Sequence, residues 1–199
     1  MNVPELLEAA GLLAPAAAAG GGPALDDVWD DLVRDDWESA LTLLEELRDP
    51  ASPPPGARAW EDLAEAAAEA RLPRSAAWCH WRAFEARHGS VRAELTLPAP
   101  GQGPRSAPFA GAGVLRPPWD LGHRDAHGRP VLDIAVVWVE GAEWLGPGQR
   151  AVVRLAPLDP ARWRHLRPGR VIALYEGALA TATAVVLEVR ALEPAGPAA

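Results

Sequence analysis

Residues 91–97 read VRAELTL, and the alternation of apolar and polar side chains in this segment decides the fold class of the second half of the chain. Apolar residues occupy every second position, which is the period of a half-buried β-strand and not of a helix. Similar strands are predicted at 131–139, 150–155, 170–175 and 182–190. The connections between them are rich in turn residues and too short for crossover helices, which indicates an antiparallel sheet. Five or six such strands close most simply into a small barrel without exposed edges.

The stretch PFAGAGVLRPPWDLG, residues 108–122, is too broken by glycine and proline for a helix and too apolar for a solvated linker. We predict that it is the segment entering the barrel, because glycines let backbones approach each other and prolines end strand pairing at a rim.

The first half of the chain has helical periodicity. A short helix near residues 3–10 is followed by a linker, APAAAAGGGPA at 14–24, whose small residues predict flexibility. Within residues 26–50, Trp37, Leu41, Leu44 and Leu47 form one helical stripe, and Asp49-Pro50 ends it.

Residues 57–72 and 73–89 predict two more helices, joined by a tight turn at Pro73 and closed by Gly89. This hairpin is weakly similar to a single tetratricopeptide-type unit, but no second copy follows it, and a plain helical bundle is the simpler interpretation. We therefore predict an α+β protein with a helical bundle over 1–90 and an antiparallel β-barrel over 91–199 that ends in a short tail.

The composition excludes several classes of chemistry. About half of the 199 residues are apolar, which is enough for a core, and all 19 basic residues are arginine. Without lysine, Schiff-base catalysis and the phosphate-binding lysine of a P-loop are excluded. The single cysteine, Cys79, excludes an internal disulfide and fits a reducing compartment. Acidic residues near the start and the lack of a long apolar run predict a cytoplasmic protein that does not enter a membrane.

The net charge of −8 is distributed unevenly along the chain. Residues 1–100 carry 8 arginines and 18 acidic residues, whereas residues 101–199 carry 11 arginines and 9 acidic residues. An acidic chain repels nucleic acid in general, although a basic face on the second half could still attract it.

From about Val91 to Arg190, the order of short motifs resembles the third domain of translation elongation factor Tu, the C-terminal β-barrel of that GTPase. The motifs are a glycine and arginine loop, a Pro-Phe pair, an arginine-proline pair before a strand, two Pro-Gly turns and a Glu-Gly hairpin. In this sequence they stand at 103–105, 108–109, 113–117, 147–148, 168–169 and 176–177.

This resemblance implies a small β-barrel, and it does not imply GTP hydrolysis, because the chain has no GTPase domain and no Walker-type loop. The family's final hairpin helps to hold the tRNA T-stem with an arginine and a threonine after paired glycines. Ala178, Leu179 and Ala180 stand at the corresponding place here.

We find no constellation for catalysis or for a cofactor. GAGVLR at 111–116 lacks the third glycine of a dinucleotide loop, and His123 and His127 lie in a glycine-rich segment that favours a solvated loop over a metal site. Cys79 and His80 are adjacent on a helix and point in different directions, so Cys79 is interpreted as a small buried residue. We expect no enzyme activity, no metal, no cofactor and no bound nucleotide.

The candidate binding residues form two charged groups. In ARWRHLRPGR, residues 161–170, arginines surround a tryptophan that could stack on a base or anchor a partner. The alternative is that Trp163 and Leu166 plug the barrel end while the arginines stay solvated or pair with the acidic half of the chain. The candidates of the basic group are five arginines and one tryptophan: Arg116, Arg162, Trp163, Arg164, Arg167 and Arg170.

The acidic candidates are Asp27, Asp30 and Asp31, which could equally be a solubilising helix face. From these two groups we predict a non-catalytic binding protein that acts through protein–protein contacts. One concrete form is an immunity or antitoxin-type inhibitor whose acidic face blocks a basic toxin. The alternative is an RNA-binding or translation-associated module that uses the barrel.

Overall fold

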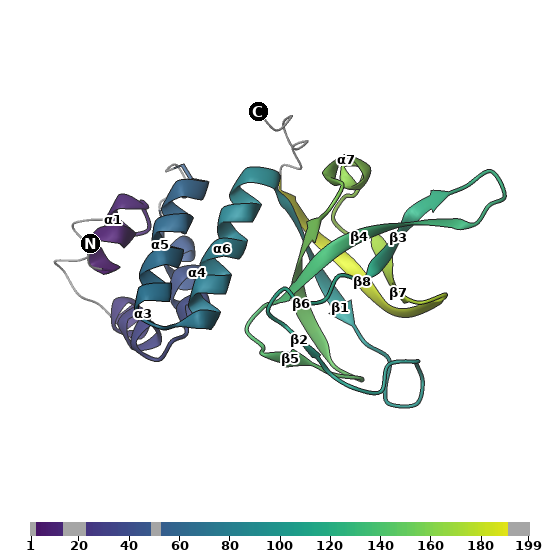
Figure 1. Cartoon of the computed structure of the whole chain (residues 1–199), viewed down its shortest axis with the longest axis horizontal. Helices are drawn as coiled ribbons and strands as arrows, with labels where there is room; N and C mark the ends of the chain where they lie inside the picture. The colour runs from purple at the N-terminus through teal and green to yellow at the C-terminus, as the bar shows by residue number, and fades with distance from the viewer. Residues whose placement is uncertain (1–2, 14–22, 49–52, 191–199) are drawn as a thin grey trace. The chain divides into compact units, whose positions relative to one another are not determined.

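The computed structural model describes residues 3–13, 23–48 and 53–190, and it combines helices with a β-barrel. The chain divides into two compact units, Met1–Arg87 and His88–Ala199 (Figure 1). The change from helical to strand periodicity, which the sequence places at residue 91, lies close to this boundary.

Among the described residues of the first unit, the longer helices each bury an apolar stripe. On α5, for example, Trp60, Leu63, Ala64 and Ala67 are buried, which is the spacing of one helical face. Cys79 on α6 is also fully buried, so its prediction as a small core residue is confirmed. The helices are α1 Val3–Ala9, α3 Pro23–Val33, α4 Trp37–Leu47, α5 Ala57–Glu69 and α6 Pro73–His88.

The acidic run before residue 50 contains two helices, α3 and α4, separated by a short break. Asp35 has a positive φ of 64°, and Asp36 caps α4 by accepting a hydrogen bond from the Ser39 backbone N–H at 3.2 Å. An aspartate at this position satisfies one of the free N–H groups of the first turn. The predicted stripe follows α4, where Trp37, Leu41 and Leu44 are buried, but Leu47 is exposed.

Three sequence predictions fall largely on residues that the structure does not describe. Residues 14–22 of the predicted linker lie outside the described residues. Its last two residues, Pro23 and Ala24, are the first residues of α3. The proposed stop at Asp49-Pro50 and the tail at 191–199 also lie outside them.

A buried arginine joins three helices of the first unit. Arg82 on α6 donates from both terminal nitrogens to the Glu45 carboxylate, at 2.7 and 2.6 Å, and its Nε lies 3.0 Å from Glu85. Its guanidinium carbon also lies 4.5 Å from the centre of the Trp60 ring on α5. The planar guanidinium suits this bidentate and stacked arrangement, which fixes α4, α5 and α6 relative to one another.

The second unit contains a closed barrel of six antiparallel strands, as the sequence predicts. The order around the barrel is β1-β6-β4-β3-β7-β8, and β8 pairs back to β1. A separate two-stranded sheet pairs β2 with β5. The barrel strands are β1 Ser90–Thr96, β3 Pro118–Arg124, β4 Pro130–Val139, β6 Arg150–Pro157, β7 Val171–Glu176 and β8 Leu179–Arg190, and the pair is β2 Phe109–Ala110 and β5 Trp144–Leu145.

Strand β3 was not predicted from periodicity, which indicated a loop over its C-terminal part, although the family resemblance implied a strand after the arginine-proline pair at 116–117. Trp119 and Leu121 alternate with Asp120 and Gly122, and both apolar side chains are buried in the barrel. Gly122 has a φ of +97°, and the pairing with β4 shifts its register after Asp120. This irregularity hides the strand in the sequence, because glycine normally weakens a strand.

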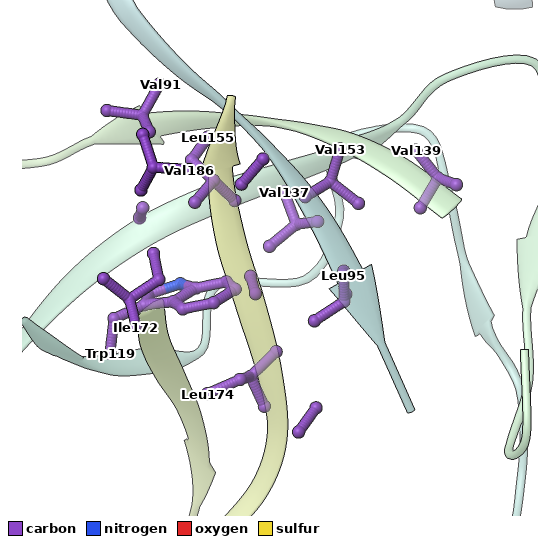
Figure 2. Close-up of a cluster of buried hydrophobic side chains, with 14 of the residues drawn as sticks. Val91, Leu95, Trp119, Val137, Val139, Val153, Leu155, Ile172, Leu174 and Val186 are labelled. Atoms are coloured by element: carbon purple, nitrogen blue, oxygen red, sulfur yellow. The ribbon is translucent and has the colours of Figure 1, made fainter. Parts of the chain in front are cut away.

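The barrel interior is filled by the inward residues of all six strands. Figure 2 shows labelled side chains from each strand converging on one cluster, with the Trp119 ring among aliphatic residues. In β1, for example, Val91, Ala93 and Leu95 are buried and belong to this cluster. The interior is therefore a packed core, and the outer strand faces and the loops at the barrel ends are the surfaces open to a ligand.

The stretch 108–122 contributes β2, a turn and β3, so it does lead into the barrel. A Cβ on Gly111 would lie 2.4 Å from the Ala142 carbonyl oxygen and 3.0 Å from the Val139 Cβ. The Gly111 N–H donates to the Glu143 carbonyl at 2.8 Å, and the Val139 N–H donates to the Gly111 carbonyl at 2.8 Å. Glycine is required here because the backbone of this segment packs directly against the chain that follows β4.

No helix among the described residues has the length and apolar character that crossing a bilayer requires.

Candidate binding surface at the α7 end of the barrel

The predicted basic segment contains a short helix, α7 Pro160–Trp163, that lies between β6 and β7 (Figure 1). Trp163 and Leu166 have no exposed surface and belong to the barrel core. The Trp163 ring meets the Trp119 ring edge-on, with centroids 6.4 Å apart. The prediction that Trp163 could stack on a base or anchor a partner is therefore wrong, because its ring is buried in the barrel core and no face of it is accessible. The alternative, in which Trp163 and Leu166 plug the barrel end, agrees with the structure.

Arg162 is held by a carboxylate from the barrel. Its Nε pairs with Asp133 of β4, whose side chain is almost completely buried. Asp133 is the register partner of Trp119, so the ion pair lies beside the Trp119–Trp163 contact. Because a buried carboxylate needs a compensating cation, Arg162 has a structural role in attaching α7 to the barrel.

Two histidines tie the same backbone to β3. His123 Nε2 and His165 Nδ1 lie 3.1 and 3.0 Å from the Arg162 carbonyl oxygen, and His165 Nε2 lies 3.2 Å from the Leu121 carbonyl. The two rings are 4.6 Å apart. A carbonyl only accepts, so each ring nitrogen donates when it carries the proton. His123 belongs to β3 and is half-buried, which corrects its interpretation as part of a solvated loop, whereas His127 lies exposed in the turn after β3, as predicted.

Three arginines of the segment remain at the surface. Arg164, Arg167 and Arg170 are exposed, and Arg167 Nη1 donates to the Arg164 and Leu166 carbonyls, both at 2.7 Å. The guanidinium of Arg170 lies over Gly122, with its Nη2 only 2.6 Å from the place of a Cβ on that residue. The structure thus brings these three arginines to one end of the barrel, next to β3.

Nearby arginines lower the pKa of the Asp120 carboxyl group. Partial burial alone would raise the pKa of Asp120, but the hydrogen bonds from Arg124 and from the Gly122 N–H and the charges of Arg124 and Arg170 lower it overall. Arg124 Nη1 donates to Asp120 at 2.8 Å. Asp120 therefore stays ionised and compensates part of the positive charge on β3.

Arg116, the fifth candidate arginine, stands in the segment between β2 and β3 and is exposed. It therefore belongs to a different connection from the arginines of 162–170, which lie between β6 and β7.

The acidic candidates lie on α3 of the first unit. Asp27 and Asp30 are exposed and Asp31 is half-buried, and their spacing of three and four residues puts them on one helix face. Arg34 pairs with Asp30 at 2.9 Å and lies 3.6 Å from Asp31. Within the described part of the chain, Asp27 has no ion-pair partner, so this face keeps a negative charge.

Sequence reasoning missed an apolar row on the outer face of the barrel, formed by Pro118, Ile134 and Leu158. Pro118 of β3 is the register partner of Ile134 on β4, and the Leu158 N–H donates to the Ile134 carbonyl at 3.0 Å. Ile134 is 43% exposed and Leu158 is 57% exposed. The signal was present in VLDIAVVWV at 131–139, where apolar residues occupy both faces of a strand although only one face can point into the barrel.

The described residues contain no group of three or more histidine, cysteine, aspartate or glutamate side chains placed to hold a metal ion. A scan against protein-family models and a search of curated proteins find no match to this chain.

Proposed function

We propose that this protein is a non-catalytic binding protein that acts through protein–protein contacts. The observation that carries the proposal is the set of large apolar side chains exposed on the outer faces of the barrel strands. Ile134 and Leu158 lie on one side, and Val171 and Leu187 lie on β7 and β8. Contiguous exposed apolar residues beside arginines are typical of protein interfaces, whereas single ones are ordinary.

The state of the only thiol supports the non-catalytic part of the proposal. Burial raises the pKa of Cys79 to about 12, and the nearby charge of Arg82 lowers it only in part. A thiol acts as a nucleophile through its thiolate, which this pKa suppresses near neutral pH.

The specific form we propose is an inhibitor of the immunity or antitoxin type, in which the acidic face of α3 contacts a basic partner. Support comes from Asp27 and Asp30, which are exposed on one helix face. Charge complementarity of this kind speeds association and selects partners. In this proposal the five described helices of the first unit form a bundle that exposes α3 to the partner.

We also propose that the barrel is related to the third domain of elongation factor Tu, on the strength of the six ordered motifs between residues 103 and 177. An experimental structure tests this kinship, because a related barrel must share the strand order β1-β6-β4-β3-β7-β8 and its connections. A different order in the family's barrel removes the proposal.

Affinity purification of the tagged full chain from its host tests the protein-binding function. We compare the wild type with two variants, D27N/D30N/D31N and I134D/L158D, and with L179D as a matched control. Leu179 is at least as exposed as Ile134 and Leu158, and it lies at the start of β8, away from α7. The proposal requires a defined partner that is lost from one of the two variants and kept by L179D. Eluates that do not differ between any of these proteins refute it.

RNA binding is the second candidate function, because Arg164, Arg167 and Arg170 are exposed together at the α7 end. Filter binding at low salt with a labelled RNA hairpin tests it. RNA binding requires that retention falls with added salt and falls again in R164A/R167A/R170A. Arg162 is left intact in this variant, because its pairing with Asp133 attaches α7. A wild-type protein that retains no RNA at low salt removes this candidate.

A further inference from the structure

The apolar row consists of Pro118 on β3, Ile134 on β4 and Leu158, the residue that directly follows β6. Ile134 stands opposite Pro118 on one side, and the hydrogen bond from the Leu158 N–H holds Leu158 next to it on the other. Residues that face each other across an antiparallel pair have Cβ atoms about 5 Å apart on the same face. The exposed side chains of Ile134 and Leu158 can therefore contact one and the same apolar group of a ligand.

The row leads directly into the positively charged segment. Leu158 is followed by Asp159 and α7, and then by the exposed Arg164 and Arg167. Asp159 is the one carboxylate in residues 158–170, which contain four arginines. Asp133, which directly precedes Ile134 on β4, is buried and forms an ion pair with Arg162. The segment that follows the row in the chain therefore carries a net positive charge, and its exposed arginines attract carboxylates.

We propose that the apolar row and the adjoining Arg164 and Arg167 form a docking surface for an acidic protein segment that carries an apolar anchor side chain. The inference rests on the proposed protein-binding function and specifies the chemistry of the partner. The anchor packs between Ile134 and Leu158, and glutamate or aspartate side chains next to the anchor pair with the guanidinium groups. Arginine suits this role because its fork binds carboxylates bidentately.

The same observations favour a peptide over RNA at this place. Base stacking needs an available aromatic ring. Trp163 of α7 is buried in the core, and the ring of His165 already contacts His123 and faces the Arg162 and Leu121 carbonyls with its two nitrogens. Aliphatic side chains such as Ile134 and Leu158 contribute nothing to phosphate binding. An acidic segment without an apolar anchor would leave the row exposed, so both parts of the partner are required.

NMR amide spectra of the labelled full chain, titrated with short synthetic peptides, test the inference. The probe is a peptide with a central Leu-Leu pair between glutamates. Two matched peptides replace the leucines by glycine or the glutamates by lysine, and a single-stranded RNA of similar length is the fourth probe. We expect the Leu-Glu peptide to shift amides within 132–136 and 156–167, and to bind about tenfold more tightly than either matched peptide.

Two variants test the named side chains. I134D/L158D and R164A/R167A should each weaken binding of the Leu-Glu peptide by about tenfold, and L179D should leave it unchanged. Well-dispersed spectra of the variants show that they are folded. Only the effect of the arginine variant should shrink at high salt, because the apolar contact is not screened.

Several results overturn the inference. They are equal binding of the glycine or lysine peptide, binding of the RNA in preference to the peptides, or no binding of the Leu-Glu peptide. If the peptide does not bind but a partner still co-purifies with the full chain, the partner chemistry is wrong and the protein-binding function stands. If no variant changes the co-purified proteins, the function itself fails.

Discussion

Trp163 is the residue whose replacement most directly tests the architecture of the α7 end. It lies outside the strands, yet it is completely buried and packs edge-on against Trp119. Replacing a buried tryptophan by alanine lowers the free energy of unfolding by about 3–5 kcal/mol. The loss of an aromatic–aromatic contact contributes about 0.5–1.5 kcal/mol to that figure. For Trp163→Ala we therefore expect the barrel to lose about 4 kcal/mol, a large fraction of the roughly 5–15 kcal/mol that stabilises a domain.

Native-state hydrogen exchange followed by NMR measures this loss for the barrel separately from the helical unit. The Val137 N–H donates to the Leu115 carbonyl at 3.0 Å, and the exchange of this amide, together with that of Leu155 on β6, reports on the barrel. A loss of about 4 kcal/mol corresponds to a protection factor that falls roughly a thousandfold. The Trp163→Phe variant should lose much less, about 1 kcal/mol, because the Trp163 Nε1 has no hydrogen-bond partner among the described residues.

Leu179→Ala is the control, because this side chain is 60% exposed and its truncation should change the protection by less than about 0.5 kcal/mol. The reasoning is refuted if Trp163→Ala lowers the protection of the strand amides by less than tenfold. It is also refuted if exchange increases only within residues 158–170. Either result would mean that Trp163 covers the barrel without being part of its cooperative core.

Three further predictions concern single side chains. Gly111→Ala should destabilise the barrel by about 1–3 kcal/mol in the same exchange measurement, because the added methyl would meet the Ala142 carbonyl oxygen; an unchanged protection factor contradicts this. The pKa of Glu140 is lowered, since burial would raise it but the hydrogen bond from Arg92 and nearby arginine charges outweigh burial. Its stabilising contribution is therefore present above the usual glutamate pKa of about 4.3 and is lost as the pH falls through the lower folded value, so acid unfolding of Glu140→Gln should show a weaker pH dependence than the wild type. Cys79 should not react with a thiol reagent at pH about 8 until urea unfolds the helical unit, and fast labelling of the native protein would disprove its burial.

The strands that follow a regular alternation could be predicted from the sequence, and the irregular one could not. VRAELTL specifies β1 and its inward face, since side-chain direction in a strand depends only on position. Strand β3 contains Gly122 and a change of register, so its local pattern resembles a loop. Only the pairing of Trp119 with Asp133 on one side and with Leu174 on the other makes it a strand.

The sequence predicts residues 161–170 as a candidate binding segment, but in the structure several of these residues have different roles from those that their types suggest. The sequence groups four arginines and one tryptophan within 161–170. In the structure Trp163 is buried and Arg162 is paired with Asp133, while Arg164, Arg167 and Arg170 are exposed. The exposed row of Ile134 and Leu158 was missed although residues 131–139 are apolar on both faces of the strand, because the residue types of the row are those of a core.

Local period and composition are enough to predict that the second half is an antiparallel barrel, that the first half is helical, and that lysine-dependent catalysis and an internal disulfide are excluded. These properties do not depend on contacts between distant residues. Which charges are neutralised and which apolar residues stay exposed depends on the three-dimensional packing of the chain. Arg162 meets a carboxylate 29 positions away in the chain, and Leu158 lies beside Ile134 through the pairing of β6 with β4. The burial of a side chain depends on such partners, and local spacing contains no information about them.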